Sequence, residues 1–125
     1  MKPSVDFDIQ DEDVEPTVGV RIMNVGPGPA VIKKVTYYVD RKPVRDEEEA
    51  IGYGKLSGSL VRYYSFDEDD TLAKDEQHFL FYLSTKHKKE LDRFIDFIDE
   101  HLAIEVTYCS LKGDCVTKCS TKGRC

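Results

Sequence analysis

The sequence predicts a mainly β fold: an antiparallel β-sandwich of about seven strands with one amphipathic α-helix near residues 86–101. Three observations predict it. Short segments alternate apolar and polar residues with the period of two that is typical of half-buried strands. One segment near the C-terminal end has the apolar period of a helix. Turn residues separate these segments at regular spacing, which leaves few connections long enough for the crossovers of a parallel sheet.

The 125 residues are expected to form a single domain, residues 1–125, in which residues 117–125 are a flexible cysteine-containing tail. The sequence is 40% hydrophobic and 34% charged. Aromatic and β-branched residues are plentiful, so the high charged fraction does not indicate disorder.

The N-terminal part of the chain contains three alternating segments, at residues 4–9, 17–24 and 31–40. Each predicts a strand. A turn at residues 40–43 then leads into Val44. The residues that share one apolar face are Val5, Phe7 and Ile9 in the first segment, Val18, Val20 and Ile22 in the second, and Val35, Tyr37 and Val39 in the third.

The middle of the chain is less regular. Residues 45–56 are compatible with a short helix that Gly52 or Gly54 ends. Residues 59–66 alternate again and predict a strand. Residues 76–84 are apolar on both faces around Phe79 to Leu83, so this strand is expected to be central in its sheet.

The predicted helix places apolar residues at intervals of three and four, with charged residues on the other face. Ser84 or Thr85 is expected to cap its start. After it, "AIEVTYC" predicts a strand, "SLKGDC" a tight turn around Gly113, and Val116 the start of a last strand. The helix's apolar residues are Leu91, Phe94, Ile95, Ile98 and Leu102, and the strand's inward residues are Ile104, Val106 and Tyr108.

The segment "NVGPGPA" (residues 24–30) breaks the alternation between the second and third strands. Pro27 and Pro29 have no N–H to donate to a sheet, so pairing is expected to lapse there and to resume at Ala30 or Val31. In immunoglobulin-like sandwiches these two strands lie in opposite sheets, and an immunoglobulin-like topology therefore predicts a crossing at this point. The alternative is that the two glycines of this segment let a ligand approach the backbone.

This segment, with "VIKKVTYYVD", "FLFYL", the helix and "IEVTYCSLKGDCV", resembles a group of uncharacterised bacterial proteins. They share an Asn-x-Gly-x-Gly-Pro-Ala element and an end of the form Tyr-x-Ser-x-x-Gly-x-x-aromatic, and often carry hydrophobic N-terminal segments ahead of a soluble domain. The resemblance covers most of residues 24–116 and implies a small immunoglobulin-like sandwich presented at a bacterial membrane. It departs from the pattern where Val116 or a neighbour replaces the terminal aromatic residue, and no catalytic residue carries over.

Four cysteines lie within the last seventeen residues, spaced C-x5-C-x3-C-x5-C. Structural zinc sites usually begin with closer pairs, so disulfides are the preferred interpretation and a zinc site the alternative. Cys109 and Cys115 flank the expected hairpin and can face each other across it. Cys119 and Cys125 can pair across "STKGR", or a tail cysteine can cross back. Disulfides predict an extracytoplasmic location, whereas four free thiols in a frayed tail are the remaining possibility.

The formal net charge of −6 and several acidic runs argue against nucleic-acid binding. No apolar run reaches the length of a membrane span, and "MKPSVDFDIQDED" has no signal-peptide core. The chain is therefore expected to be either cytosolic or a soluble part of a protein with an N-terminal anchor outside it. The resemblance favours the second location, in the bacterial cell envelope.

The tyrosines come in adjacent pairs, which places one of each pair on the outward face of a strand. An outward group of Tyr38, Tyr63 and Tyr64 can form a partner-binding surface. The alternative is that these rings only stabilise cross-strand contacts. Exposed edge strands also make a homodimer by strand addition a prediction.

No catalytic motif is present. The segment "GYGKLSGS" (residues 52–59) lacks the first glycine and the Ser or Thr of a phosphate loop, and "DEDDTLAKDEQH" lacks the glycine and glutamate of an EF-hand. We therefore expect a non-enzymatic interaction or structural module without cofactor. The alternative is a metal-binding or redox-responsive module that uses the four cysteines, with zinc as the metal.

Overall fold

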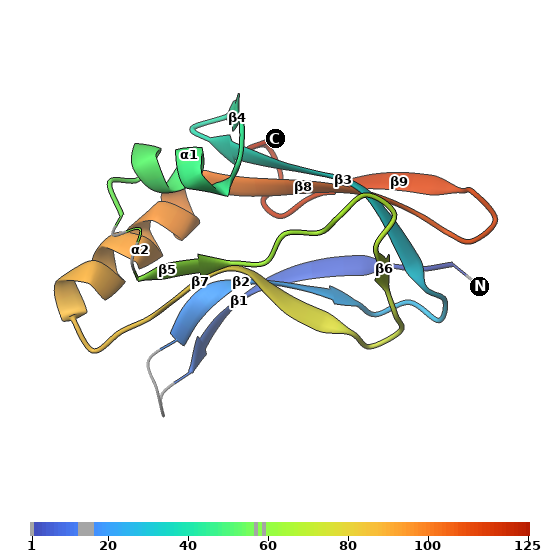
Figure 1. The fold of residues 1–125 in the computed structure, drawn as a ribbon, viewed down its shortest axis with the longest axis horizontal. Coiled ribbons are helices and arrows are strands. Elements are labelled where there is room, and N and C mark those ends of the chain that lie inside the picture. The colour runs from blue at the N-terminus through green and yellow to red at the C-terminus, as the bar shows by residue number, and fades with distance from the viewer. Residues whose placement is uncertain (1, 13–16, 57, 59) are drawn as a thin grey trace.

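The computed structural model of the chain describes residues 2–12, 17–56, 58 and 60–125. Within them, nine strands form two antiparallel sheets that face each other, and two helices pack beside the sheets (Figure 1). The prediction of a mainly β sandwich is confirmed. The elements in chain order are β1 (Val5–Glu12), β2 (Thr17–Asn24), β3 (Ala30–Val39), β4 (Lys42–Val44), α1 (Glu47–Tyr53), β5 (Val61–Tyr63), β6 (Thr71–Leu72), β7 (Gln77–Ser84), α2 (Lys88–Glu100), β8 (Leu102–Cys109) and β9 (Cys115–Cys119).

The strands divide between the sheets in the order β1-β2-β7-β5 and β4-β3-β8-β9, and the short β6 pairs with β3. The consecutive strands β2 and β3 therefore lie in opposite sheets, as the break at residues 24–30 predicts. Strand β7 lies between β2 and β5, which confirms the central position expected from its two apolar faces.

The core lies between the sheets and is built by the alternating residues of the facing strands. Val18, Val20 and Ile22 of β2 are buried on one side, and Ile104, Val106 and Tyr108 of β8 on the other. Helix α2 closes one end of the sandwich, where it contacts β2 and β7 of one sheet and β8 of the other (Figure 1). Its Phe94 ring stacks on Phe81 of β7 with 5.7 Å between the ring centroids. Full burial of one such side chain stabilises the fold by about 1.5–3 kcal/mol.

The connection between β2 and β3 is organised by Asn24, which is completely buried. Its side-chain nitrogen donates to the carbonyls of Gly28 (2.8 Å) and Leu72 (3.0 Å). Its side-chain oxygen accepts from the N–H groups of Gly26 (3.1 Å) and Ser4 (3.3 Å). One amide thus replaces the sheet hydrogen bonds that the two prolines cannot make.

The N-terminal segment passes directly over Gly26 and leaves no space for a side chain at this position. A Cβ atom there would lie 2.3 Å from the Ser4 nitrogen and 2.6 Å from the Lys2 carbonyl oxygen. The space in front of this glycine is therefore filled by the chain itself. The structural interpretation of the Gly-Pro segment accounts for Gly26 without a ligand.

Both helices agree with the sequence interpretation, but the start of α2 differs from it. The amphipathic helix expected at residues 86–101 is α2, and the short helix compatible with residues 45–56 is α1, which ends at Gly54. The residue before α2 is His87, which makes no side-chain cap hydrogen bond. The Thr85 hydroxyl accepts the N–H of His87 (3.1 Å), the residue that precedes the helix. Neither Ser84 nor Thr85 therefore caps α2. Residues 85–87 are not helical, so α2 begins at Lys88 and not at residue 86.

The described chain has two strands more than the seven predicted, because β4 and β6 contain only three and two residues and give no alternation to detect. Residues 117–119 belong to β9, and Ser120 exchanges two hydrogen bonds with Ile104 (2.7 and 2.8 Å). The prediction of a flexible tail at residues 117–125 is therefore wrong for residues 117–120. Ser59, the first residue of the expected strand 59–66, and Met1, Asp13 and Ser57 lie outside the described residues.

Candidate functional site

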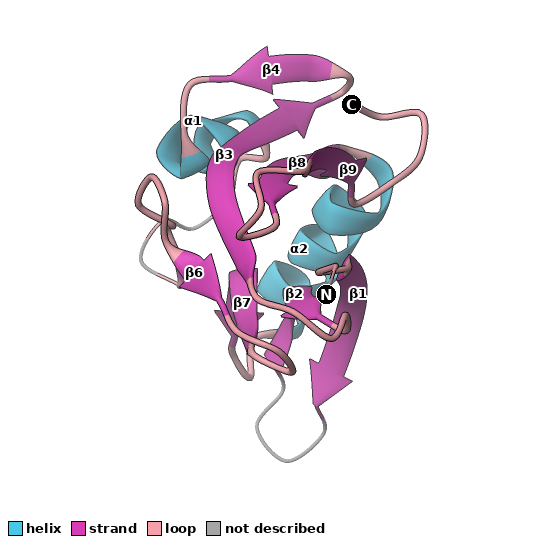
Figure 2. Ribbon diagram, turned by 90° about the vertical axis from the view of Figure 1, so that its right-hand side faces the viewer, coloured by secondary structure: helices cyan, strands magenta, loops and turns pink. Residues whose placement is uncertain are grey.

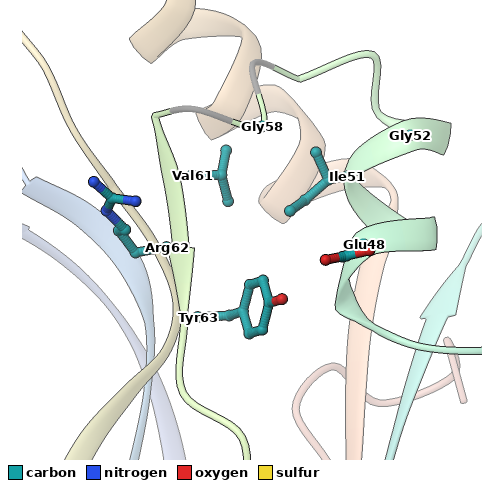
Figure 3. A pocket seen from close by; sticks show the side chains of 7 residues that line it. All are labelled: Glu48, Ile51, Gly52, Gly58, Val61, Arg62 and Tyr63. Atoms are coloured by element: carbon teal, nitrogen blue, oxygen red, sulfur yellow. The ribbon is translucent and has the colours of Figure 1, made fainter.

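The candidate site is an open cavity of about 580 Å³ between helix α1 and the edge strand β5 (Figure 3). Figure 2 shows α1 beside β3 and below β4, so the cavity lies at an edge of the sandwich. Two surfaces face each other across it, one from the helix and one from the strand. The lining residues are Glu48, Ile51, Gly52, Gly58, Val61, Arg62 and Tyr63.

Helix α1 is held by a strong N-terminal cap. The Asp46 side chain accepts the Glu49 N–H (2.9 Å), and three acidic residues, 47–49, follow in the first turn. Acidic side chains are stabilised there by the helix dipole. The backbone N–H of Glu49 and the Arg45 side chain lower the pKa of Asp46. Because Ala50 and Ile51 are buried against the sandwich, the acidic first turn is fixed at the rim of the cavity.

Strand β5 presents alternate residues to the cavity. Val61 and Tyr63 point toward α1, whereas Arg62 points to the other side of the strand (Figure 3). The strand is held in the sheet by its pairing with β7, in which Val61 lies opposite Leu83 and Tyr63 opposite Phe81. Tyr63 is 38% exposed. Partial burial, and then the charges of Glu48 and Glu47, raise the pKa of Tyr63, because each disfavours the ionised form of its hydroxyl.

Tyr37 of β3 adds a buried hydroxyl next to the same group. The residue is only 3% exposed, and its ring is 6.2 Å from that of Phe81. Its hydroxyl oxygen has no hydrogen-bond partner of acceptable geometry among the described residues. Burial raises its pKa, and the charge of Glu47, a hydrogen-bonding contact with that carboxylate and the neighbouring Tyr63 raise it further. The buried hydroxyl therefore stays protonated.

Glu47 links α1 to the chain after β5, because its carboxylate accepts the Ser65 hydroxyl (3.1 Å). The cavity itself combines the Glu48 carboxylate and the exposed Tyr63 ring with the apolar side chains of Ile51 and Val61. Carboxylates and ring faces are groups that bind cations. Within the part of the chain that the structure describes, no three His, Cys, Asp or Glu residues are placed to hold a metal ion.

The three tyrosines predicted as one partner surface are not brought together. Tyr63 faces the cavity, but Tyr64 stacks on His78 with 4.2 Å between ring centroids and meets Phe66 edge-on at 5.0 Å. Tyr38 is on β3 in the other sheet and donates to Glu105 of β8 (3.4 Å). An outward position is therefore not enough to form one surface, because each ring belongs to a different local cluster.

The four cysteines form the two local disulfides, Cys109–Cys115 and Cys119–Cys125, and none is free. Cys109 and Cys115 lie directly opposite each other in the β8–β9 pairing, as the predicted hairpin requires. The preferred interpretation of the sequence is confirmed. In this oxidised state, the sulfurs offer no thiolate to the zinc site that was the alternative.

Sequence reasoning missed Glu48 as a lining residue of the cavity, and Tyr37 and Glu47 as its neighbours. Alternation places Tyr37 on the inner face of its strand, where a core tyrosine needs no further role, and the acidic run at residues 46–49 has the composition of a solvated loop. One signal was present. Asp46 followed by Glu49 has the spacing of a helix-capping pair, and this pattern predicts an ordered acidic turn.

Comparisons with known protein families, curated proteins and solved structures find no match to this chain. Among the described residues, no helix is long and apolar enough to cross a membrane.

Proposed function

We propose that this chain is a non-enzymatic interaction module: the soluble domain of a membrane-anchored bacterial protein, located on the extracytoplasmic side of the membrane, where it binds a protein partner. The observation that carries the proposal is the pairing of all four cysteines into Cys109–Cys115 and Cys119–Cys125. Disulfides of this kind form and persist in oxidising compartments and are rare in the cytosol.

The strand order supports the same setting by analogy. The sheets β1-β2-β7-β5 and β4-β3-β8-β9 have the order A-B-E-D and C′-C-F-G of immunoglobulin-like sandwiches. Many cell-surface domains use this architecture to present a binding surface, although the architecture alone does not define a function. The helix α2, inserted between β7 and β8, distinguishes this chain from the simple sandwich.

The cavity between α1 and β5 supports a binding role. Its described lining presents the Glu48 carboxylate and the Tyr63 ring beside the aliphatic side chains of Ile51 and Val61. Groups of this kind recognise a partner by charge and shape. Pairing of two copies through the outer strands of the sheets stays a prediction, which sedimentation analysis tests.

The test is the thiol state of the protein in its native cells. Cells are quenched in acid, the protein is denatured, and free thiols are alkylated before its intact mass is measured. We expect no alkylated thiol before reduction and four after it, with the protein in the envelope fraction. Four alkylated thiols directly from the cells would overturn the proposal and would favour the cysteine-based metal or redox module.

A further inference from the structure

We infer that a second cavity of this chain binds a carboxylate group through two arginines, Arg41 and Arg124. The cavity is open, has a volume of about 370 Å³, and lies where the turn after β3, the end of α2 and the C-terminal loop meet. Its lining residues are Asp40, Arg41, Glu100, His101 and Arg124. The inference goes beyond the proposed function, because it assigns a ligand class to a part of the molecule that the cavity beside α1 does not include.

Three segments that are far apart in the sequence are fixed at this cavity. The Asp40 N–H donates to the His101 carbonyl (2.9 Å), which holds the turn between β3 and β4 against the end of α2. The C-terminal loop lies beside this turn (Figure 2). The loop is closed by the disulfide between Cys119 and Cys125, and Arg124 directly precedes the second of these residues. Because Cys119 belongs to β9, the disulfide holds Arg124 in a fixed position relative to the sheet.

The cavity contains one guanidinium group more than its carboxylates can pair. The Asp40 carboxylate is engaged by His101, whose Nδ1 lies 2.6 Å from it. Glu100 is the second carboxylate of the lining. Neither Arg41 nor Arg124 forms an ion pair with any described residue. Two guanidinium groups thus share the cavity with one unengaged carboxylate, and an incoming carboxylate balances the remaining charge.

The guanidinium group of Arg124 is an independent indication. Its Nη1 atom is buried and has no hydrogen-bond partner among the described residues. A polar group that is removed from water without a partner costs free energy, and native proteins keep few of them. The positive charge is delocalised over the whole guanidinium group. An anion that binds the other nitrogens of Arg124 therefore compensates the charge that the buried nitrogen shares.

A singly charged carboxylate fits this arrangement better than a phosphate. Guanidinium groups bind carboxylates through two parallel hydrogen bonds. Asp40 and Glu100 line the same cavity, and they repel a doubly charged phosphate more strongly than a carboxylate. Because the cavity is open, the carboxylate can belong to a small organic acid or to an acidic side chain of a larger partner.

The first experiment compares probes that differ in charge and size. The folded, oxidised chain is isotope-labelled and titrated by NMR at neutral pH and constant ionic strength. The probes are acetyl-Ala-Glu-Ala-amide, its glutamine analogue, propionate and inorganic phosphate. We expect saturable shift changes at the N–H groups of Arg41, His101 and Arg124 with the glutamate peptide, at a Kd of about 1 mM. The glutamine peptide should bind at least about fivefold more weakly.

Equal binding of the glutamate and glutamine peptides would overturn the inference, and so would tighter binding of phosphate than of the glutamate peptide. Propionate identifies the source of the carboxylate. Binding of propionate as tightly as the glutamate peptide would support the site and assign it to small organic acids. Weaker binding of propionate would support the site and assign it to an acidic side chain of a larger partner.

The second experiment uses variants of the two arginines. Arg124→Gln should weaken binding of the glutamate peptide about fivefold and Arg41→Gln about threefold, because each removes one guanidinium group. Arg124→Lys keeps the charge without the paired hydrogen bonds and should weaken binding about twofold. Lys122→Gln is the matched control, since it removes the same charge from an exposed residue of the same loop outside the cavity and should change the Kd little. Equal effects of Arg124→Gln and Lys122→Gln would overturn the inference.

The third experiment tests how Arg124 is held. The double variant Cys119→Ser, Cys125→Ser retains the Cys109–Cys115 disulfide and the pairing of β8 with β9. We expect it to bind the glutamate peptide as weakly as Arg124→Gln, because the released loop no longer fixes Arg124 at the cavity. Unchanged binding would contradict the inference. All three experiments use the purified chain, so their failure is distinguishable from failure of the proposed extracytoplasmic location.

Discussion

Two regions of this molecule bury a polar side chain beside the core, and they differ in how well its hydrogen bonds are formed. In the connection between β2 and β3, the amide of Asn24 is buried, and both its oxygen and its nitrogen are bonded to the protein. Beside α1, the hydroxyl of Tyr37 is almost as buried but has no partner in the described part of the chain. The first region has a full set of well-formed hydrogen bonds, whereas the second leaves a buried hydroxyl beside the Glu47 carboxylate without one.

The largest effect is expected at the complete region. Asn24→Ala removes an amide that makes four hydrogen bonds and leaves the carbonyls of Gly28 and Leu72 buried without this partner. At about 1 kcal/mol for each hydrogen bond, the free energy of unfolding should fall by about 3–4 kcal/mol. Urea unfolding measures it. The neighbouring Val25→Ala, at a residue that is 49% exposed, should cost about 0.5 kcal/mol or less, and a similar loss in both variants would show that Asn24 has no special role.

The same contrast applies to backbone space. In Gly26→Ala, the new methyl group would overlap the backbone of Ser4 and Lys2, so the segments must separate, at a cost of about 1–3 kcal/mol. A Cβ atom added at Gly52 of α1 would meet no other atom within 4 Å, and Gly52→Ala should instead stabilise the helix by up to about 1 kcal/mol. Thermal unfolding of both variants compares them. A destabilised Gly52→Ala would contradict the open cavity beside α1.

The sequence predicted the complete region better than the open one, for a physical reason. The prolines at 27 and 29 constrain the backbone locally, and alternation fixes which face of β2 and β3 is inward, so the crossing between sheets follows from nearby residues. The cavity depends on residues far apart in the chain. Glu48 belongs to α1 and Tyr63 to β5, and no local pattern predicts that they face each other.

Tyr37→Phe should show the opposite sign from Asn24→Ala. Removal of a hydroxyl that has no partner among the described residues relieves its desolvation and leaves the ring contact with Phe81 in place. The free energy of unfolding should rise by about 1 kcal/mol. Loss of stability in Tyr37→Phe would show that the hydroxyl is satisfied in solution, and the comparison between the two regions would fail.

The smallest effect is expected at an exposed polar pair. His101, after the end of α2, lies 2.6 Å from a carboxylate oxygen of Asp40 and 3.7 Å from one of Asp96. The hydrogen bond to Asp40, supported by the charges of Asp40, Asp96 and Glu100, raises the pKa of His101. Because the folded-state pKa is higher than the unfolded one, the stabilisation is complete below about pH 6.5 and is lost as the pH rises through the folded-state pKa.

The side chains of His101 and Asp40 are 43% and 66% exposed, so solvent screens the pair. The resulting loss of unfolding free energy between about pH 6 and pH 8 should be about 0.5 kcal/mol or less, and His101→Gln should remove this dependence. Urea unfolding at both pH values, with and without added salt, checks it. A pH dependence as large as the effect of Asn24→Ala would mean that exposure does not set the energetic weight of a polar group in this protein. The contrast between the two buried regions would then need another cause.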